Sequence, residues 1–91
     1  MNRFNRVTLK RGLAKRVIDG KMYLVDSETS TLHQLNESGT IIVKKLEKGM
    51  GIERIINQIV EDYEVERKRA EKDVLFFIKG LKDKGLIIED G

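Results

Sequence analysis

The 91-residue sequence contains no cysteine and only one histidine, His33. Without cysteine, neither a disulfide framework nor a thiolate metal site or thiol nucleophile can form. A single histidine excludes a histidine-rich metal site and a catalytic dyad with cysteine, and a lone histidine on a strand is more often a packed or surface residue. We therefore expect no catalytic residue, no metal ligand and no cofactor.

Long apolar runs and nucleotide-binding glycine motifs are also missing. No run approaches the roughly 18 apolar residues that span a bilayer, and the N-terminus lacks the apolar segment of a secretory signal. The eight glycines form neither a P-loop nor a G-x-G-x-x-G motif. We expect a soluble, cytoplasmic protein that is not an enzyme and has no membrane partner.

Charge is distributed unevenly along the chain. Residues 1–21 carry seven cationic side chains against one anionic side chain, whereas residues 22–91 carry eleven against fourteen. A chain of this length suffices for one domain with a small core. We predict a basic, flexible arm over residues 1–13 and a single domain over residues 14–91, so a nucleic acid would have to meet the arm or the first hairpin.

Three short strands are predicted after the arm. The runs Lys15–Ile18 and Lys21–Val25 flank the pair Asp19-Gly20, which favours a type I′ hairpin turn. The third strand, Thr31–Leu35, follows the polar turn "DSETS", and no later segment is predicted to pair with it. The strands therefore form an antiparallel meander whose last strand lies at an edge. Alternation divides the side chains of that strand between two faces, Thr31, His33 and Leu35 on one, Leu32 and Gln34 on the other.

Three amphipathic helices follow the meander. Asn36 is predicted to cap the first, which runs to about Lys48 and stops at Gly49. The fold class is therefore α+β, an N-terminal three-stranded antiparallel β-meander followed by a three-helix bundle. Apolar residues of the second helix form one continuous stripe, which predicts a single buried face: Ile52, Ile55, Ile56, Ile59, Val60 and Tyr63.

The third helix, from about Glu66 to Lys84, has a wide apolar surface. Five consecutive apolar residues, Val74–Ile78, cover nearly the whole circumference of one turn. This turn is either buried on two sides or exposes apolar surface to a partner. Gly85 fits a Schellman C-cap, after which residues 86–90 are predicted to be a short extended tail.

Two segments of the chain resemble the PqqD-like family. "DSETSTLHQLNESG" is similar to the family's acidic turn, strand and helix start, and "AEKDVLFFIKGLKDKGLI" is similar to its last helix. The resemblance, which covers residues 16–87, implies a winged helix-turn-helix-like domain that binds the leader segment of a ribosomally made precursor peptide. Such a domain presents the leader to a modifying enzyme, for example a radical SAM enzyme or a leader peptidase, in the biosynthesis of PQQ, a lasso peptide or another modified peptide.

The resemblance also implies where the leader would bind. The leader would add a strand to the edge strand, whose backbone is supplied by Thr31, Leu32, His33 and Gln34, with Leu32 or His33 flanking a groove beside the third helix. One flank of that helix combines an aromatic ring with side chains of both charge signs. We favour this flank as the wall of the groove over the flank of Glu71 and Leu75. The helical site residues are then Arg69, Asp73, Phe76 and Phe77, with Gly80 beside them.

Two other functions fit the same elements. A DNA-binding winged helix would combine three helices, a small sheet and a basic arm, but only six residues follow Gly85, where a wing would lie. The third helix begins "ERKRAEKD", four cations with three anions, which suits a phosphate-facing surface poorly. A structural subunit that holds a partner protein's strand is the other alternative.

Of these functions we favour peptide binding, so the leader peptide is the expected partner. We expect a monomer or weak dimer.

Overall fold

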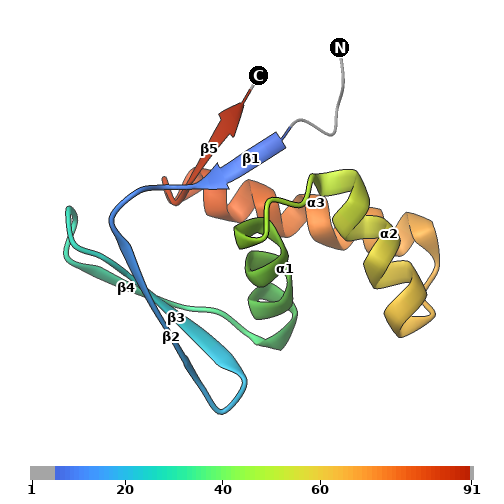
Figure 1. Ribbon diagram of the computed structural model, residues 1–91, viewed down its shortest axis with the longest axis horizontal. Coiled ribbons are helices and arrows are strands. Elements are labelled where there is room, and N and C mark those ends of the chain that lie inside the picture. Colours follow the sequence, from blue (N-terminus) through green and yellow to red (C-terminus); the bar gives the residue numbers. More distant parts are fainter. Residues whose placement is uncertain (1–5, 91) are drawn as a thin grey trace.

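The computed structural model describes residues 6–90, with the side chains of residues 7–88, and combines two small sheets with three helices (Figure 1). The α+β class, the predicted meander and the three predicted helices are present, with nearly the predicted boundaries. In chain order the elements are β1 Arg6–Leu9, β2 Leu13–Ile18, β3 Lys21–Asp26, β4 Thr31–Gln34, α1 Glu37–Glu47, α2 Ile52–Tyr63, α3 Arg67–Asp83 and β5 Ile87–Asp90.

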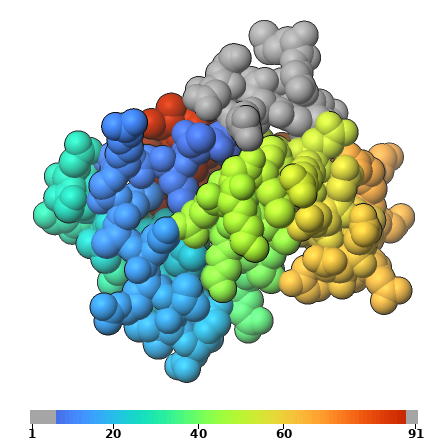
Figure 2. Space-filling view, in the orientation of Figure 1, coloured from blue at the N-terminus to red at the C-terminus, as the bar shows by residue number. Residues whose placement is uncertain are grey.

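β3 is the central strand of the meander, between β2 and β4. Both residues of the β2–β3 turn have positive φ, 53° at Asp19 and 78° at Gly20, as a type I′ turn requires. In the β3–β4 ladder, Leu24 lies opposite His33. β4 is therefore an edge strand, as predicted, and the tip of the β2–β3 hairpin projects beyond the helices (Figure 2).

A second sheet, which the sequence does not predict, joins the two ends of the described chain. β1 pairs antiparallel with β5, from Arg6 opposite Asp90 to Leu9 opposite Ile87. Residues 6–9 of the arm predicted over residues 1–13 thus form a strand, and the predicted extended tail is their partner strand. Each strand has only four residues, too few for a clear period. Residues 1–5 of the predicted arm lie outside the described residues.

The core lies between the helix-facing side of the meander and the three helices. Gly85 adopts a φ of 73°, and the N–H of Leu86 donates to the carbonyl of Leu81 at 2.9 Å, which confirms the Schellman cap. This cap turns the chain from α3 into β5 and places Leu86 inside the core. The fully buried side chains include Met22, Leu24, Ile55, Ile56, Val43, Val74 and Leu86.

The apolar stripe of α2 is buried only in its first half. Ile55 and Ile56 are buried, whereas Ile59 is half-buried and Tyr63 is 54% exposed. The single buried face predicted for this helix is therefore present except at its last residue, Tyr63, since Ile59 and Val60 still pack against the core. Ile59 and Tyr63 also line an open cavity, so they are less buried than Ile55 and Ile56.

Polar contacts join the end of the meander to α1, and we call them the Thr40 corner. The N–H of Met22 donates to Oγ1 of Thr40 at 2.9 Å, and the Thr40 hydroxyl donates to the carbonyl of Asn36 at 2.9 Å. The N–H of Leu35 donates to the carbonyl of Met22 at 2.8 Å. Oδ1 of Asn36 accepts from the N–H of Gly39 at 2.8 Å, which confirms the predicted N-cap.

Lys10 ties the β1–β2 connection to the end of β3. Its Nζ lies 2.9 Å from Oδ2 of Asp26 and 2.6 Å from Oε1 of Glu28. The hydrogen bond from Lys10 holds the pKa of Asp26 below its usual range, and the bonds to Glu28 and Asp26 hold the pKa of Lys10 above its usual range. Lys10 and Asp26 are therefore charged at neutral pH, and the contacts of Lys10 fix the path of the chain from β1 to β2.

We predict that Thr40→Val lowers the free energy of unfolding by about 1–3 kcal/mol, because the N–H of Met22 is then buried without an acceptor. Valine has nearly the shape of threonine, so packing is kept. Urea unfolding monitored by circular dichroism measures the change. Thr40→Ser, which keeps the hydroxyl, is the control and should cost less; a Thr40→Val variant as stable as the original would contradict the account.

Candidate functional site

A groove of about 410 Å³, which we call the α3 groove, lies between the β4–α1 junction and α3. Phe76 stands beside it with 78% of its surface exposed. A large exposed ring next to an apolar groove is typical of a surface that meets a partner. The groove is lined by residues of the junction and of α3, among them Leu35, Asn36, Phe76, Phe77, Gly80 and Lys84.

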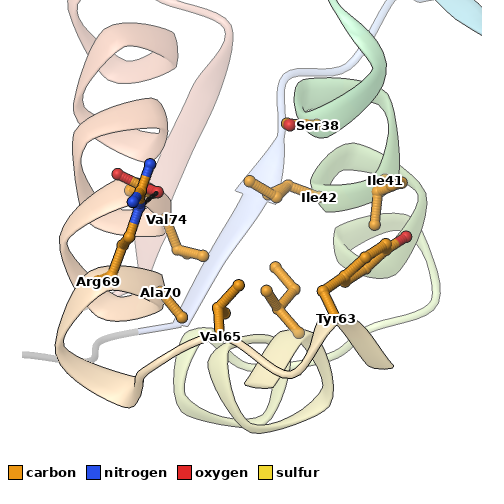
Figure 3. Close-up of a pocket in the computed structure, with 10 residues that line it drawn as sticks. Ser38, Ile41, Ile42, Tyr63, Val65, Arg69, Ala70 and Val74 are labelled. Atoms are coloured by element: carbon orange, nitrogen blue, oxygen red, sulfur yellow. Dashed lines mark ion pairs between the residues drawn. The ribbon is translucent and has the colours of Figure 1, made fainter. Parts of the chain in front are cut away.

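A second cavity of about 220 Å³, the helix cavity, lies between α1, the end of α2 and the start of α3 (Figure 3). It shares Ser38, Ile42 and Asp73 with the α3 groove, so the two hollows adjoin. Arg69 lies on the α3 side, and its Nε is 3.8 Å from Oδ2 of Asp73. The remaining lining is apolar apart from the Tyr63 hydroxyl: Ile41, Ile59, Tyr63, Val65, Ala70 and Val74.

The open edge of β4 presents alternate backbone groups. The N–H of Leu35 donates to the carbonyl of Met22, which shows the side of the chain that turns toward β3. Backbone groups alternate in direction along an antiparallel strand, so those of His33 also turn toward β3. The N–H and C=O groups of Leu32 and Gln34 therefore lie at the open edge, where no strand of the described chain pairs with them.

The side chains of β4 divide between the two faces of the meander as predicted. His33 lies opposite the fully buried Leu24, so His33 and Thr31 turn to the helix side. There Oγ1 of Thr31 lies 3.1 Å from Nε2 of His33. Leu32 and Gln34 turn to the other face, and Leu32 is 64% exposed. Of the two residues predicted to flank the groove, His33 is the one on the helix side.

The structure places the predicted α3 residues in adjoining positions. Asp73, Phe76 and Phe77 line the α3 groove, whereas Arg69 lines the helix cavity next to it. Leu75, on the alternative flank, packs half-buried against the core. The favoured flank is thus the one that borders the groove, and the part that these side chains take in binding stays a prediction.

Sequence reasoning missed several groove residues. Lys84 follows Phe76 and Gly80 at intervals of four residues, so helical spacing could have revealed it. Leu35 and Asn36 carried no such signal, because only the packing of α3 beside the junction turns a strand end and a helix cap into a groove wall.

The main features of the site are an apolar groove and the free backbone groups of a strand edge. Within the described part of the chain, no three histidine, aspartate or glutamate side chains gather closely enough to hold a metal ion. None of its helices is both long and apolar enough to cross a membrane. An open strand edge beside an apolar groove is typical of domains that bind an extended peptide by strand addition.

The fold and this site therefore define a small α+β domain with an open strand edge beside an apolar groove. The chain belongs to the PqqD family, since residues 21–87 match the family model described as Coenzyme PQQ synthesis protein D (PqqD). This match confirms the resemblance to the PqqD-like family.

Two solved structures are similar to the chain over most of its length. One is TbiB1 in complex with the TbiA(beta) leader peptide, with 29% identity, a TM-score of 0.84, and coverage of 88% of this chain and 93% of that one. The other is a lasso peptide synthetase B1 complexed with its leader peptide, with 28% identity, a TM-score of 0.84, and coverage of 91% and 98%. No curated protein matches the chain.

Two glycines near the groove should respond oppositely to substitution by alanine. A Cβ at Gly80 would meet nothing within 4 Å, and alanine is the better helix former, so Gly80→Ala should raise the free energy of unfolding by up to about 1 kcal/mol. A Cβ at Gly39 would lie 2.6 Å from Cε1 of Phe77, so Gly39→Ala should lower it. Urea unfolding of both variants measures the difference, and equal stabilities would show that the contact between Gly39 and Phe77 is not as tight as described.

Proposed function

We propose that this chain is a non-catalytic protein that binds the leader segment of a ribosomally made precursor peptide. The observation that carries the proposal is the open edge of β4 beside the α3 groove. Two structures of similar fold that contain leader peptides support it, as does membership of the PqqD family. Preformed edges of this kind bind extended segments mainly through main-chain hydrogen bonds.

In this proposal the leader becomes a fourth strand of the meander. Its backbone pairs with Leu32 and Gln34, whose N–H and C=O groups turn to the open edge. Every second side chain of an added strand points to the same face, so alternate leader residues turn to the helix side. There an apolar leader side chain meets the ring of Phe76 above the open surface at Gly80. The backbone pairing supplies affinity, and the α3 groove supplies selectivity.

The bound domain then presents the precursor to a modifying enzyme without any cofactor of its own. The family description points to PQQ synthesis, and one similar structure is a lasso peptide synthetase subunit. In this proposal the partner enzyme is a radical SAM enzyme or a leader peptidase. The step assigned to this chain is to hold the leader while the enzyme modifies the rest of the precursor.

The alternative of a DNA-binding winged helix has less support. A wing is a hairpin that follows the recognition helix, whereas β5 follows α3 and pairs with β1 from the other end of the chain. The exposed side of α3 also carries the ion pairs Arg69–Asp73 and Lys79–Asp83. Carboxylates at these positions would repel phosphate groups. We therefore favour the peptide over DNA as the ligand.

Gly80→Trp tests the binding site because it places an indole in the α3 groove. We expect it to weaken leader binding by about tenfold or more, since displaced apolar contacts of roughly 1.4 kcal/mol correspond to that factor. Isothermal titration with the leader of a precursor encoded beside this chain measures the affinity. Lys79→Trp adds the same indole at the neighbouring exposed position of α3 and should bind normally. Equal affinities of the two variants would place the leader elsewhere.

A further inference from the structure

The face of the meander that turns away from the helices is largely uncovered and apolar. Three of its side chains are notably exposed: Ile18 at 48%, Val25 at 41% and Leu32 at 64%. Together with Ala14, Arg16 and Tyr23 they line a shallow depression of about 440 Å³. We call it the outer sheet face. An apolar patch of this kind on a soluble domain marks an interaction site more often than a scatter of single residues does.

The charges on the outer sheet face have one sign. Strand alternation places Arg16 of β2 and Lys21 of β3 on it, and both are exposed. No carboxylate occupies an outward position on β2, β3 or β4, because Asp26 lies on the opposite face and is buried. A second copy of the chain would bring cations against cations. A partner surface with apolar side chains and a rim of carboxylates would be complementary.

The outer sheet face is continuous with the proposed leader site. Leu32 and Gln34 turn their side chains to this face while their backbone groups lie at the open edge of β4. A leader strand paired with that edge would therefore place half of its own side chains on the outer sheet face, next to Leu32. The leader side chains that turn to the helices would fill the α3 groove. Those that turn the other way would extend the apolar surface of the outer sheet face.

We infer that the outer sheet face docks the modifying enzyme, through an apolar surface of that enzyme rimmed by carboxylates. The inference rests on the proposed function, because the docking surface is complete only when the leader strand is present. The enzyme contacts β2, β3 and the exposed side of the leader together, so it recognises the complex in preference to either component. The leader thereby reaches the enzyme already held in an extended conformation.

Val25→Glu and Arg16→Glu test this docking surface, because neither residue belongs to the leader site. Ile88→Glu is the matched control, since Ile88 is also an exposed apolar residue of a strand, at 53% on β5, and lies outside the outer sheet face. The probes are the leader peptide and the maturation enzyme encoded beside the precursor gene. For each variant, titration gives the leader affinity, and the rate of precursor processing against enzyme concentration gives the affinity for the enzyme.

We expect Val25→Glu and Arg16→Glu to bind the leader within about twofold of the original chain, but to lower the apparent affinity for the enzyme by about tenfold or more. Ile88→Glu should leave both values unchanged. Normal processing by Val25→Glu and Arg16→Glu, with leader binding intact, would overturn the docking surface alone. Failure of the original chain to bind any leader would overturn the proposed function with it. A dimer that Val25→Glu dissociates in sedimentation velocity would assign the face to a second copy instead.

Discussion

The hydroxyl of Thr40 holds the edge of the meander against α1. β4 ends at Gln34, so no strand carbonyl reaches the N–H of Met22, and the Thr40 hydroxyl accepts from it at 2.9 Å. The same hydroxyl donates to Asn36, whose side chain caps α1. The buried Thr40 side chain thus gives the N–H of Met22 an acceptor and links the sheet to the residue that caps α1. The angle between the edge strand and α1 is fixed before any ligand arrives.

The position of α3 follows from that angle. Gly39 lies in the first turn of α1, three residues after the cap Asn36, and its missing side chain lets the ring of Phe77 approach closely. α3 can therefore pack against the start of α1 while Phe76 remains exposed one residue away. The α3 groove forms because α3 packs against the start of α1 beside the end of β4 and does not cover that strand end. A groove formed in advance lowers the ordering cost of binding a flexible peptide.

Local chemistry predicts much of this fold, and contacts distant in sequence account for what it misses. The Asp19-Gly20 turn, the Asn36 cap and the Gly85 cap each depend on a few neighbouring residues, and the structure confirms all three. The β1–β5 sheet joins segments at opposite ends of the chain, so no local pattern indicates it. Strand alternation predicted which residues of β4 share a face, but only the burial of Leu24 opposite His33 shows which face meets the helices.

Amide hydrogen exchange of β4, with and without the leader peptide, tests the central claim most directly. Strand addition at this edge predicts that the amides of Leu32 and Gln34 exchange more slowly when the leader is bound, because they acquire acceptors. The amide of His33 turns toward β3 and should change much less. Slowing along β2, the other edge of the meander, with none at Leu32 and Gln34 would contradict the account.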